Sequence, residues 1–485
     1  SAMGGGNVGD GIIVDLGDVN RDLLRIDPAA RLARTGAAVS FSALNAEAAK
    51  QGLRLPPDPS SGRWATLGGM LSTNASGARS VRYGSVRPWV VAATLITADG
   101  RTLHLTRHDV AGAKPTPEHE SPILARFARE MEPMIRRNAP LIAERFPKVR
   151  KNSAGYALNH YLQSGDLLDL VIGSEGTLGI VTEIVWRLDP IPPFHAALRL
   201  TLPSLDRLNE LVPALLAFEP SGVELLDQSF LEIVKDSPAA RALDLQGEAA
   251  AAILVEFEGT DQEEVDRRCG DAAEVARDWS DDITVALSEE EQEELRALRH
   301  AASPILAGQS GRRSLQVIED ACVPVPRLSD YVTAVRRLAA EKKLDVVIFG
   351  HAGDGNVHVN LLPDIRTIGW EQQVATLLDE VTAEVIALGG TPTGEHGDGR
   401  LRSGYLTQLY GAPIVALFQK VKETFDPTGI LNPGIKLPAA TPAPAISRLK
   451  LGASAVELPE DIAAALREIE ITGGYAKDRM EIAGE

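Results

Sequence analysis

The chain has 485 residues, 44% of them hydrophobic and 24% charged, which is enough for two or three domains with ordinary buried cores. Its formal net charge of −18 excludes a nucleic-acid partner and disfavours tight docking on an anionic membrane. No apolar run is long enough to cross a bilayer. The two cysteines, Cys269 and Cys322, fit no metal or redox spacing and are expected to be small buried side chains in a reducing compartment. We therefore expect a cytoplasmic protein, with peripheral attachment to the inner face of a membrane left open.

Residues 1–190 are expected to form a strand-rich α+β region. Short apolar runs predict strands at residues 12–16, 170–172 and 180–188. Two further runs between Val90 and Leu105 meet at Asp99-Gly100, a strong hairpin signal. The prolines that begin at Pro190 predict a domain boundary.

Two groups of small residues in this region are candidates for ligand binding. The first covers residues 56–60, 66–70 and 72–78, and the second covers residues 173–180. Small side chains let backbone N–H groups approach a phosphate or a ring system closely. Neither group matches a phosphate loop or a strand-first Gly-x-Gly-x-x-Gly, so ATP and nicotinamide sites are not supported. Taken alone, each group is also compatible with a simple set of turns.

Residues 195–390 alternate strands and helices. Strands are predicted at 196–202 and 250–257, each followed by a helix, near 205–218 and 263–278. This repeat is compatible with a ferredoxin-like layer, though the pattern leaves other options open. Periodic apolar residues predict further helices at 371–388 and at 414–425, the second ending at Asp426-Pro427. Beyond residue 437 a proline-rich linker leads to a short amphipathic segment at 462–471, to which we assign no chemistry.

A glycine-rich turn places two histidines seven residues apart. Residues 346–349 predict a strand that delivers His351 into the turn, and residues 357–361 predict the returning strand. Alternation puts His358 and Asn360 on one face, and the glycines let the backbone bring His351 back towards them. Two imidazoles and one carboxylate commonly bind a divalent metal. The alternative is a structural turn with hydrogen-bonded core histidines, which we consider the weaker interpretation.

The carboxylate ligand of this metal site is expected to come from the segment Gly394-Glu395-His396-Gly397. Glu395 is the best candidate for a ligand, which would put His396 beside any substrate that the metal activates. An imidazole titrates near neutral pH, so His396 can accept a proton from a metal-polarised hydroxyl. A solvated loop is the alternative, and this segment alone does not separate the two.

Taken together and in this order, these segments resemble the flavin-dependent 2-hydroxy-acid dehydrogenases of the vanillyl-alcohol oxidase/p-cresol methylhydroxylase superfamily. The resemblance runs over residues 1–437 and includes Asp426-Pro427 and the segment Leu431–Gly434. It implies an α+β fold with an FAD-binding p-cresol methylhydroxylase-type domain at 1–190 and a ferredoxin-like substrate (cap) domain at 191–395. A segment at 396–437 would return to the flavin, and 438–485 would be linker and tail.

The resemblance also assigns site residues. FAD contacts are expected at Asp58, Gly68, Gly69, Asn74, Ser76, Gly77, Glu175, Gly176, Gly179, Ile180 and Asn432. A divalent metal, zinc or another ion, is expected on His351, His358 and Glu395. Four catalytic residues are expected. His396 would be the general base, and Arg299 would bind the substrate carboxylate. Asn360 would lie near the substrate, and Ser303 would assist through its hydroxyl group.

The implied reaction is oxidation of a D-2-hydroxy acid, such as D-lactate, D-2-hydroxyglutarate or glycolate, to the 2-oxo acid. Electrons would leave to an external acceptor: an iron–sulfur protein, an electron-transfer flavoprotein or a quinone. A homodimer is left open.

The sequence departs from the family pattern in three ways. A lysine that some relatives place before Asp320 is absent, so the substrate stays open. The segment Glu395-His396-Gly397-Asp398-Gly399-Arg400 looks most like that of relatives fused to a cysteine-rich iron–sulfur module, which two cysteines cannot build. The strands that normally precede the first flavin loop are also missing, so weakened FAD binding is expected if the chain starts here. Two alternatives remain at this point: a flavin-free metallohydrolase and a truncated, inactive subunit that only binds partners.

Overall fold

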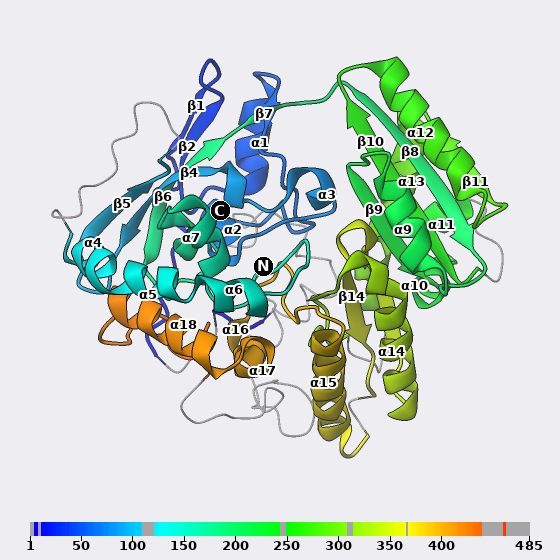
Figure 1. Cartoon of the computed structure of the whole chain (residues 1–485). Coiled ribbons are helices and arrows are strands. Elements are labelled where there is room, and N and C mark those ends of the chain that lie inside the picture. The colour runs from blue at the N-terminus through cyan, green and yellow to red at the C-terminus, as the bar shows by residue number, and fades with distance from the viewer. Residues whose placement is uncertain are drawn as a thin grey trace. The chain divides into compact units, whose positions relative to one another are not determined.

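A computed structural model describes residues 4–7, 11–108, 121–242, 249–307, 314–364, 367–438 and 459–461. The chain divides into two compact units (Figure 1). Unit 1 contains Ser1–Ile191 and Gly389–Pro442, and unit 2 contains Pro192–Leu388 and Ala443–Glu485. The sequence-based boundary at 190/191 lies next to the first change of unit. The second change comes at 388/389 rather than at 395/396, so Glu395 belongs to unit 1 together with His396.

Unit 1 is built on a five-stranded sheet in which every neighbouring pair is antiparallel. Its order is β1 (Leu24–Asp27), β2 (Leu32–Gly36), β6 (Ile180–Arg187), β4 (Val90–Ile96) and β5 (Thr102–Thr106). A two-residue pair, β3 (Leu53–Arg54) with β7 (Asp189–Pro190), stands apart from it. The hairpin predicted at Asp99-Gly100 is confirmed as β4–β5, with Gly100 at φ +78.

The helices of unit 1 come from both of its chain segments. The first segment supplies α1 (Phe41–Ala49), α2 (Leu67–Thr73), α3 (Ser80–Tyr83), α4 (Pro122–Arg126), a π-helical turn (Phe127–Met131), α5 (Glu132–Arg137), α6 (Ala139–Arg145), α7 (Leu158–Ser164) and α8 (Leu168–Val171). The second supplies α16 (Gly399–Arg402), α17 (Leu406–Tyr410) and α18 (Ala412–Phe425). Helix α18 packs against α4, the π-helical turn and α6, so distant parts of the chain share one layer (Figure 1).

Unit 2 is a seven-stranded sheet whose neighbouring strands are also antiparallel throughout. Its order is β11 (Ile283–Ala286), β8 (Phe194–Leu202), β10 (Ala251–Gly259), β9 (Gly222–Asp227), β13 (Val346–His351), β14 (Asn356–Leu361) and β12 (Ala321–Cys322). The strands of the predicted β-loop-α repeats, β8 and β10, are the second and third in this order. Their long apolar sequences suit a position that is buried on both faces.

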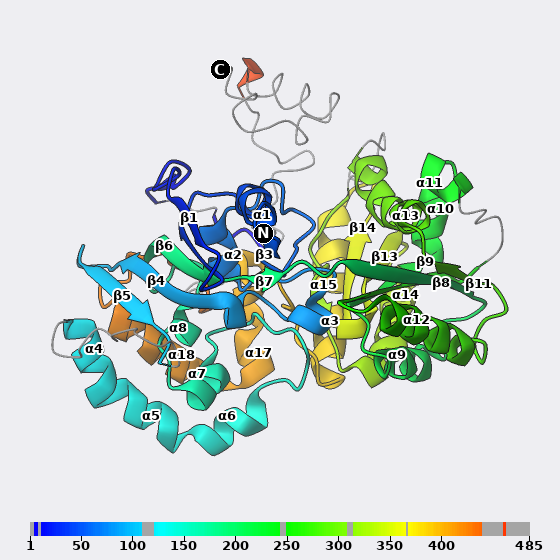
Figure 2. The ribbon, with the colours of Figure 1, turned by 90° about the horizontal axis from the view of Figure 1, so that it is seen from above.

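Helices cover both faces of this sheet (Figure 2). One face carries α9 (Leu208–Leu216), α12 (Gln262–Ala276) and α14 (Leu328–Glu341), and the other carries α10 (Gln228–Val234), α11 (Pro238–Ala242) and α13 (Glu289–Ala307). A further helix, α15 (Trp370–Ala387), packs against α14. The core under α10 and α13 is made of fully buried apolar side chains, among them Leu226, Phe230 and Leu298.

Two sequence-based strand predictions are wrong. Residues 12–16 form no strand, and Ile12, Ile13 and Val14 are 95%, 69% and 60% exposed. A short apolar run with no neighbouring strand to pair with gains little from an extended conformation. Residues 170–172 lie in and just after the helix α8, because a run of three apolar residues fits a buried helical turn as well as a strand. The segment at 462–471 lies outside the described residues.

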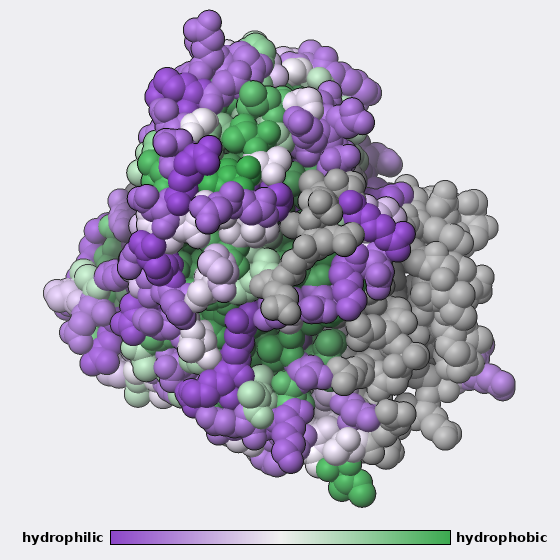
Figure 3. Space-filling model, turned by 90° about the vertical axis from the view of Figure 1, so that its right-hand side faces the viewer, coloured by the Kyte–Doolittle hydropathy of each residue, from purple (hydrophilic) through white to green (hydrophobic). Residues whose placement is uncertain are grey.

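The two cysteines are free and buried, as predicted. Burial raises the pKa of the Cys269 thiol to about 12, so it is a packing residue and not a nucleophile at neutral pH. Among the described helices, none has the length and apolar character needed to cross a membrane. The described residues on the face shown in Figure 3 are largely hydrophilic, with smaller hydrophobic areas between them.

Candidate functional site

In unit 1, the first group of small residues folds around the start of α2. Thr66 caps the helix by accepting a hydrogen bond from the N–H of Gly69 at 3.3 Å. A Cβ on Gly68 would lie 2.7 Å from the Cβ of Ala37, so only glycine lets the helix start approach this segment. Asn74 ends the helix in the left-handed region at φ +55. The loop that follows presses on the 58–59 segment, because a Cβ on Gly77 would lie 2.3 Å from the Asp58 carbonyl oxygen.

The second group lies against the first. The N–H of Glu175 donates to the Ser72 carbonyl at 2.8 Å, which joins the 173–180 loop to the end of α2. Asn432 donates to the carbonyl of Glu175 and to that of Gly6, both at 2.8 Å. Gly176 has φ +74 and open space where a side chain would stand. The residues predicted to contact FAD, including Gly179 and Ile180 at the start of β6, therefore come from loops that pack together inside one unit.

The carboxylate of Glu175 has a structural role. It accepts hydrogen bonds from the backbone N–H groups of Asp398 at 2.6 Å and Gly399 at 2.9 Å, and it forms an ion pair with Lys436 at 2.9 Å. Burial lowers the pKa of the Lys436 ammonium, but Asp398 and Glu175 outweigh burial and raise it. Gly397 at φ +82 completes the contact, since a Cβ there would lie 2.7 Å from the carboxylate carbon. This carboxylate is therefore a structural centre, and FAD contact at Glu175 would involve its backbone.

Glu395 is held by two groups from the first segment of unit 1. Its Oε2 accepts a hydrogen bond from the Ser76 hydroxyl at 2.5 Å and one from the Lys151 ammonium at 2.9 Å. The side chains of Lys151 and Glu395 are 4% and 8% exposed. Nε2 of His396 lies 3.6 Å from the other carboxylate oxygen, Oε1. The predicted base and the predicted carboxylate ligand are thus neighbours in space, and the carboxylate presents Oε1 on the side of the histidine.

In unit 2, the two histidines stand on the β13–β14 hairpin. His351 ends β13 and His358 lies in β14, and their ring centroids are 5.1 Å apart. Nδ1 of His351 bonds Oε1 of Glu224 at 2.5 Å, and Nδ1 of His358 bonds the Glu319 carbonyl at 2.7 Å. With Nδ1 held in this way, each ring would offer Nε2 to a metal, which is the usual arrangement of metal-binding histidines. The donor set of the hairpin therefore fits a divalent ion.

Glu224 also contacts the predicted substrate arginine. Its Oε2 accepts from Nε of Arg299 at 2.5 Å, so one buried carboxylate bridges Arg299 and His351. Burial raises the pKa of the Glu224 carboxyl, but Arg299 and His351 outweigh burial and hold the pKa well below its ordinary value. Glu224 is consequently an anion that orients both neighbours.

The remaining predicted residues are placed as follows. Asn360 is buried in β14 and its side-chain oxygen accepts from Ser314 at 3.3 Å. Ser303 belongs to α13, but its side chain lies outside the described residues. Sequence reasoning missed Glu224 and Lys151. Both are single charged residues in unremarkable segments, and only tertiary contacts reveal them.

Comparisons with known proteins agree with the sequence resemblance. Residues 1–106 match the family described as FAD binding domain, and residues 191–435 match FAD linked oxidases, C-terminal domain. A D-lactate dehydrogenase from Archaeoglobus fulgidus is 30% identical over 413 residues, which covers 85% of this chain and 78% of the relative. The glycolate oxidase subunit GlcD from Bacillus subtilis is 30% identical and covers 79% and 70%. A D-2-hydroxyglutarate dehydrogenase from Escherichia coli is 28% identical and covers 87% and 43%.

Solved structures show the fold alone. A 4-ethylphenol oxidase from Gulosibacter chungangensis aligns with a TM-score of 0.63 at 13% identity, over 90% of this chain and 84% of that one. A p-cresol methylhydroxylase aligns with a TM-score of 0.59 at 15% identity, over 88% and 79%. The predicted fold class, α+β with an FAD-binding domain of the p-cresol methylhydroxylase type, is confirmed.

Proposed function

The chain belongs to the FAD-linked oxidases, and from this premise we propose that it is an FAD-dependent dehydrogenase that oxidises a D-2-hydroxy acid to the 2-oxo acid. The observation that carries the proposal is the β13–β14 hairpin, which holds His351 and His358 by Nδ1 in a chain of this family. Relatives named D-lactate dehydrogenase, glycolate oxidase subunit and D-2-hydroxyglutarate dehydrogenase support this substrate class.

The proposed roles follow from the chemistry of each side chain. Arg299 holds the substrate carboxylate end-on through its terminal amino groups while Nε stays on Glu224. His351, His358 and Glu395 hold a divalent ion, zinc or another, which acidifies the substrate hydroxyl when bound. His396 accepts the hydroxyl proton at its imidazole, and Asn360 and Ser303 position the substrate. FAD, when bound against the glycine loops of unit 1, supplies the acceptor for the Cα hydride.

The side chains of Glu395 and His396 are neighbours, and this arrangement does not depend on a bound metal. Lys151 and Ser76 fix Oε2 of the carboxylate, so Oε1 is the oxygen we assign to the metal. The electrons then pass to an external acceptor, for which an iron–sulfur protein, an electron-transfer flavoprotein and a quinone are the candidates.

The test is anaerobic reduction of the FAD-supplied protein. We expect a yellow protein that is bleached by D-lactate, D-2-hydroxyglutarate or glycolate and not by the L-enantiomers of the first two. His396→Ala should slow bleaching by about 10²- to 10⁴-fold, the usual contribution of a general base, while His104→Ala on an exposed position of β5 should not. A colourless protein that still binds metal would instead favour the metallohydrolase, and an unchanged rate in His396→Ala would remove the assigned base.

A further inference from the structure

Within unit 1, two buried side chains join the carboxylate of Glu395 to the Ser76 loop (residues 72–78), which is predicted to bind FAD. The Ser76 hydroxyl donates to Oε2 of Glu395 at 2.5 Å. The Lys151 ammonium donates to the same oxygen at 2.9 Å and to the Gly77 carbonyl at 3.4 Å. Ser76 is 3% exposed and the Lys151 side chain is 4% exposed. A change at the carboxylate therefore reaches the loop through direct hydrogen bonds.

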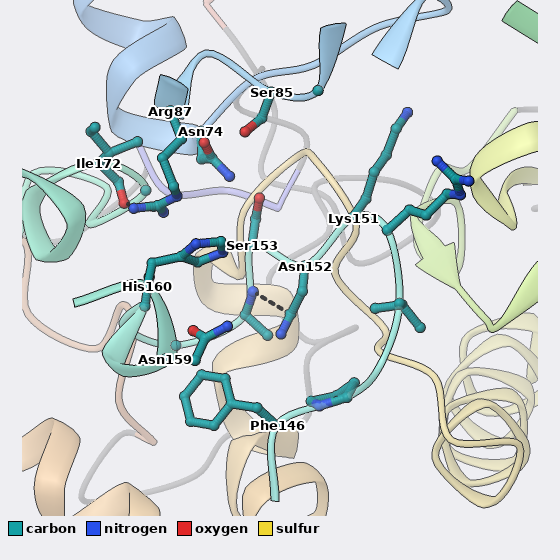
Figure 4. Close-up of a pocket in the computed structure, with 18 of the residues that line it drawn as sticks. Asn74, Ser85, Arg87, Phe146, Lys151, Asn152, Ser153, Asn159, His160 and Ile172 are labelled. Carbon is teal, nitrogen blue, oxygen red and sulfur yellow. Dashed lines mark hydrogen bonds between the residues drawn. The ribbon is translucent and has the colours of Figure 1, made fainter. Parts of the chain in front are cut away.

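The backbone that carries Lys151 is bonded to the segment that carries Glu395. Lys151 lies beside the pocket drawn in Figure 4, and its side chain leaves the backbone on the side opposite to that of Asn152. The N–H of Ser153 donates to the Thr393 carbonyl at 2.9 Å, two residues along the chain from each partner of the ion pair. The ammonium is therefore held against the carboxylate by the backbone on both sides.

The loop that carries Glu395 is also bonded to the second loop that is predicted to bind FAD, the one that contains Glu175. The Glu175 carboxylate accepts hydrogen bonds from the backbone N–H groups of Asp398 at 2.6 Å and Gly399 at 2.9 Å. The N–H of Glu175 in turn donates to the Ser72 carbonyl at 2.8 Å. The three loops therefore form one hydrogen-bonded set, and the metal carboxylate belongs to it.

A divalent ion on Oε1 of Glu395 would act on these loops in two ways. It would restrain the carboxylate and, through Ser76, the Ser76 loop, so that less conformational entropy is lost when FAD orders this loop. It would also share the negative charge of Glu395, which leaves more of the positive charge of Lys151 to attract an anion. FAD is an anion through its pyrophosphate. Both effects raise the affinity for FAD.

We propose that Ser76 and Lys151 are positioning residues that couple the binding of the two cofactors. A divalent metal at Glu395 raises the affinity of the chain for FAD, and FAD raises the affinity for the metal by the same factor. The coupling rests on the proposed function, which assigns FAD to the loops of unit 1 and a metal to Glu395. It adds that neither cofactor binds independently of the other.

The test is calorimetric titration of the FAD-free, metal-free full chain with FAD, once in EDTA and once in saturating Zn²⁺. We expect Zn²⁺ to raise the FAD affinity at least about fivefold, the lower end of the usual coupling between two sites. Titration with Zn²⁺, with and without saturating FAD, should give the same factor. Equal FAD affinities in EDTA and in Zn²⁺ would overturn the proposal, and so would unequal factors in the two titrations.

For variants, the readout is the ratio of the FAD affinities in Zn²⁺ and in EDTA, since a purely structural defect lowers both affinities together. Ser76→Ala should bring the ratio towards one, because it breaks the bond between the loop and the carboxylate and leaves Lys151 in place. Glu395→Gln should do the same, because it removes the charged metal ligand. Lys148→Met, on an exposed lysine of the same segment, is the matched control and should keep the parent ratio. An unchanged ratio in Ser76→Ala would show that the coupling does not pass through this bond.

Lys151→Met tests the contribution of the positive charge and should also lower the ratio. Because it leaves the buried carboxylate of Glu395 without its cation, circular dichroism should first show that the variant folds, and Ser76→Ala carries the test if it does not. A parent chain that fails to bind FAD or Zn²⁺ contradicts the proposed function and the coupling with it. A chain that binds both, each with an affinity independent of the other, contradicts the coupling alone.

Discussion

Two buried glutamates, one in each unit, are held in different ways. In unit 2, Glu224 extends from a central strand and bonds His351 from the neighbouring strand, so sheet register sets the distance. In unit 1, Glu395 lies in a loop and is held by Ser76 and Lys151, which are 319 and 244 residues away along the chain. Strand pairing places the first carboxylate, and a few long-range side-chain bonds place the second. Unit 1 should therefore be more sensitive to single substitutions.

The largest effect is expected at the ion pairs of Lys436. Lys436→Met leaves the buried carboxylates of Glu175 and Asp398 without their cation, and removing one partner of a buried pair costs about 3–5 kcal/mol. The free energy of unfolding, measured with urea, should fall by this amount. Lys420→Met, which breaks only the exposed pair with Glu423, is the control and should cost less than about 1 kcal/mol. A loss at Lys436 no larger than the control's would mean that backbone bonds alone hold this loop.

Acid should weaken unit 1 through His160. Its pKa is about 4 in the folded protein and about 6.5 when unfolded, so the unfolded chain binds more protons between these values and stability falls as the pH falls. At pH 4.5 the loss relative to pH 7 should be about 2–3 kcal/mol from this residue. His160→Gln should remove that part of the pH dependence, as measured by urea unfolding at both pH values. Parallel curves for parent and variant would exclude His160 as the cause.

A smaller effect, on the affinity for a metal ion, is expected in unit 2 from Glu224→Gln. The amide keeps the shape but not the charge that orients His351, and loss of such a partner typically weakens metal binding about 10- to 100-fold. Calorimetric titration of the FAD-free chain with Zn²⁺ measures this without turnover. Glu232→Gln, on an exposed side chain of α10, is the matched control. Unchanged affinity would indicate that sheet register alone orients the histidine.

The sequence predicted what depends on local pattern. The histidine hairpin appears as β13 and β14, and the predicted helix 371–388 is Trp370–Ala387, because strand alternation and helical periodicity are properties of short segments. The segments 12–16 and 170–172 were too short for their apolar pattern to distinguish a strand from another structure. Glu224 and Lys151 could not be found at all, since each acts through a contact made only by the folded chain. The flavin loops were recognisable only through the family resemblance.

The two-segment construction of unit 1 has a consequence for synthesis on the ribosome. All the strands and helices described for unit 2 lie in the continuous stretch 192–388 and can form as soon as it has emerged, whereas unit 1 must wait for residues 389–438. Until α18 arrives, Phe146 and Tyr156 lack the ring of Phe418 that packs edge-on against both. A nascent chain that stalls before this point would carry the folded sheet of unit 2 and a unit 1 with an open apolar surface, a state prone to aggregation and chaperone capture.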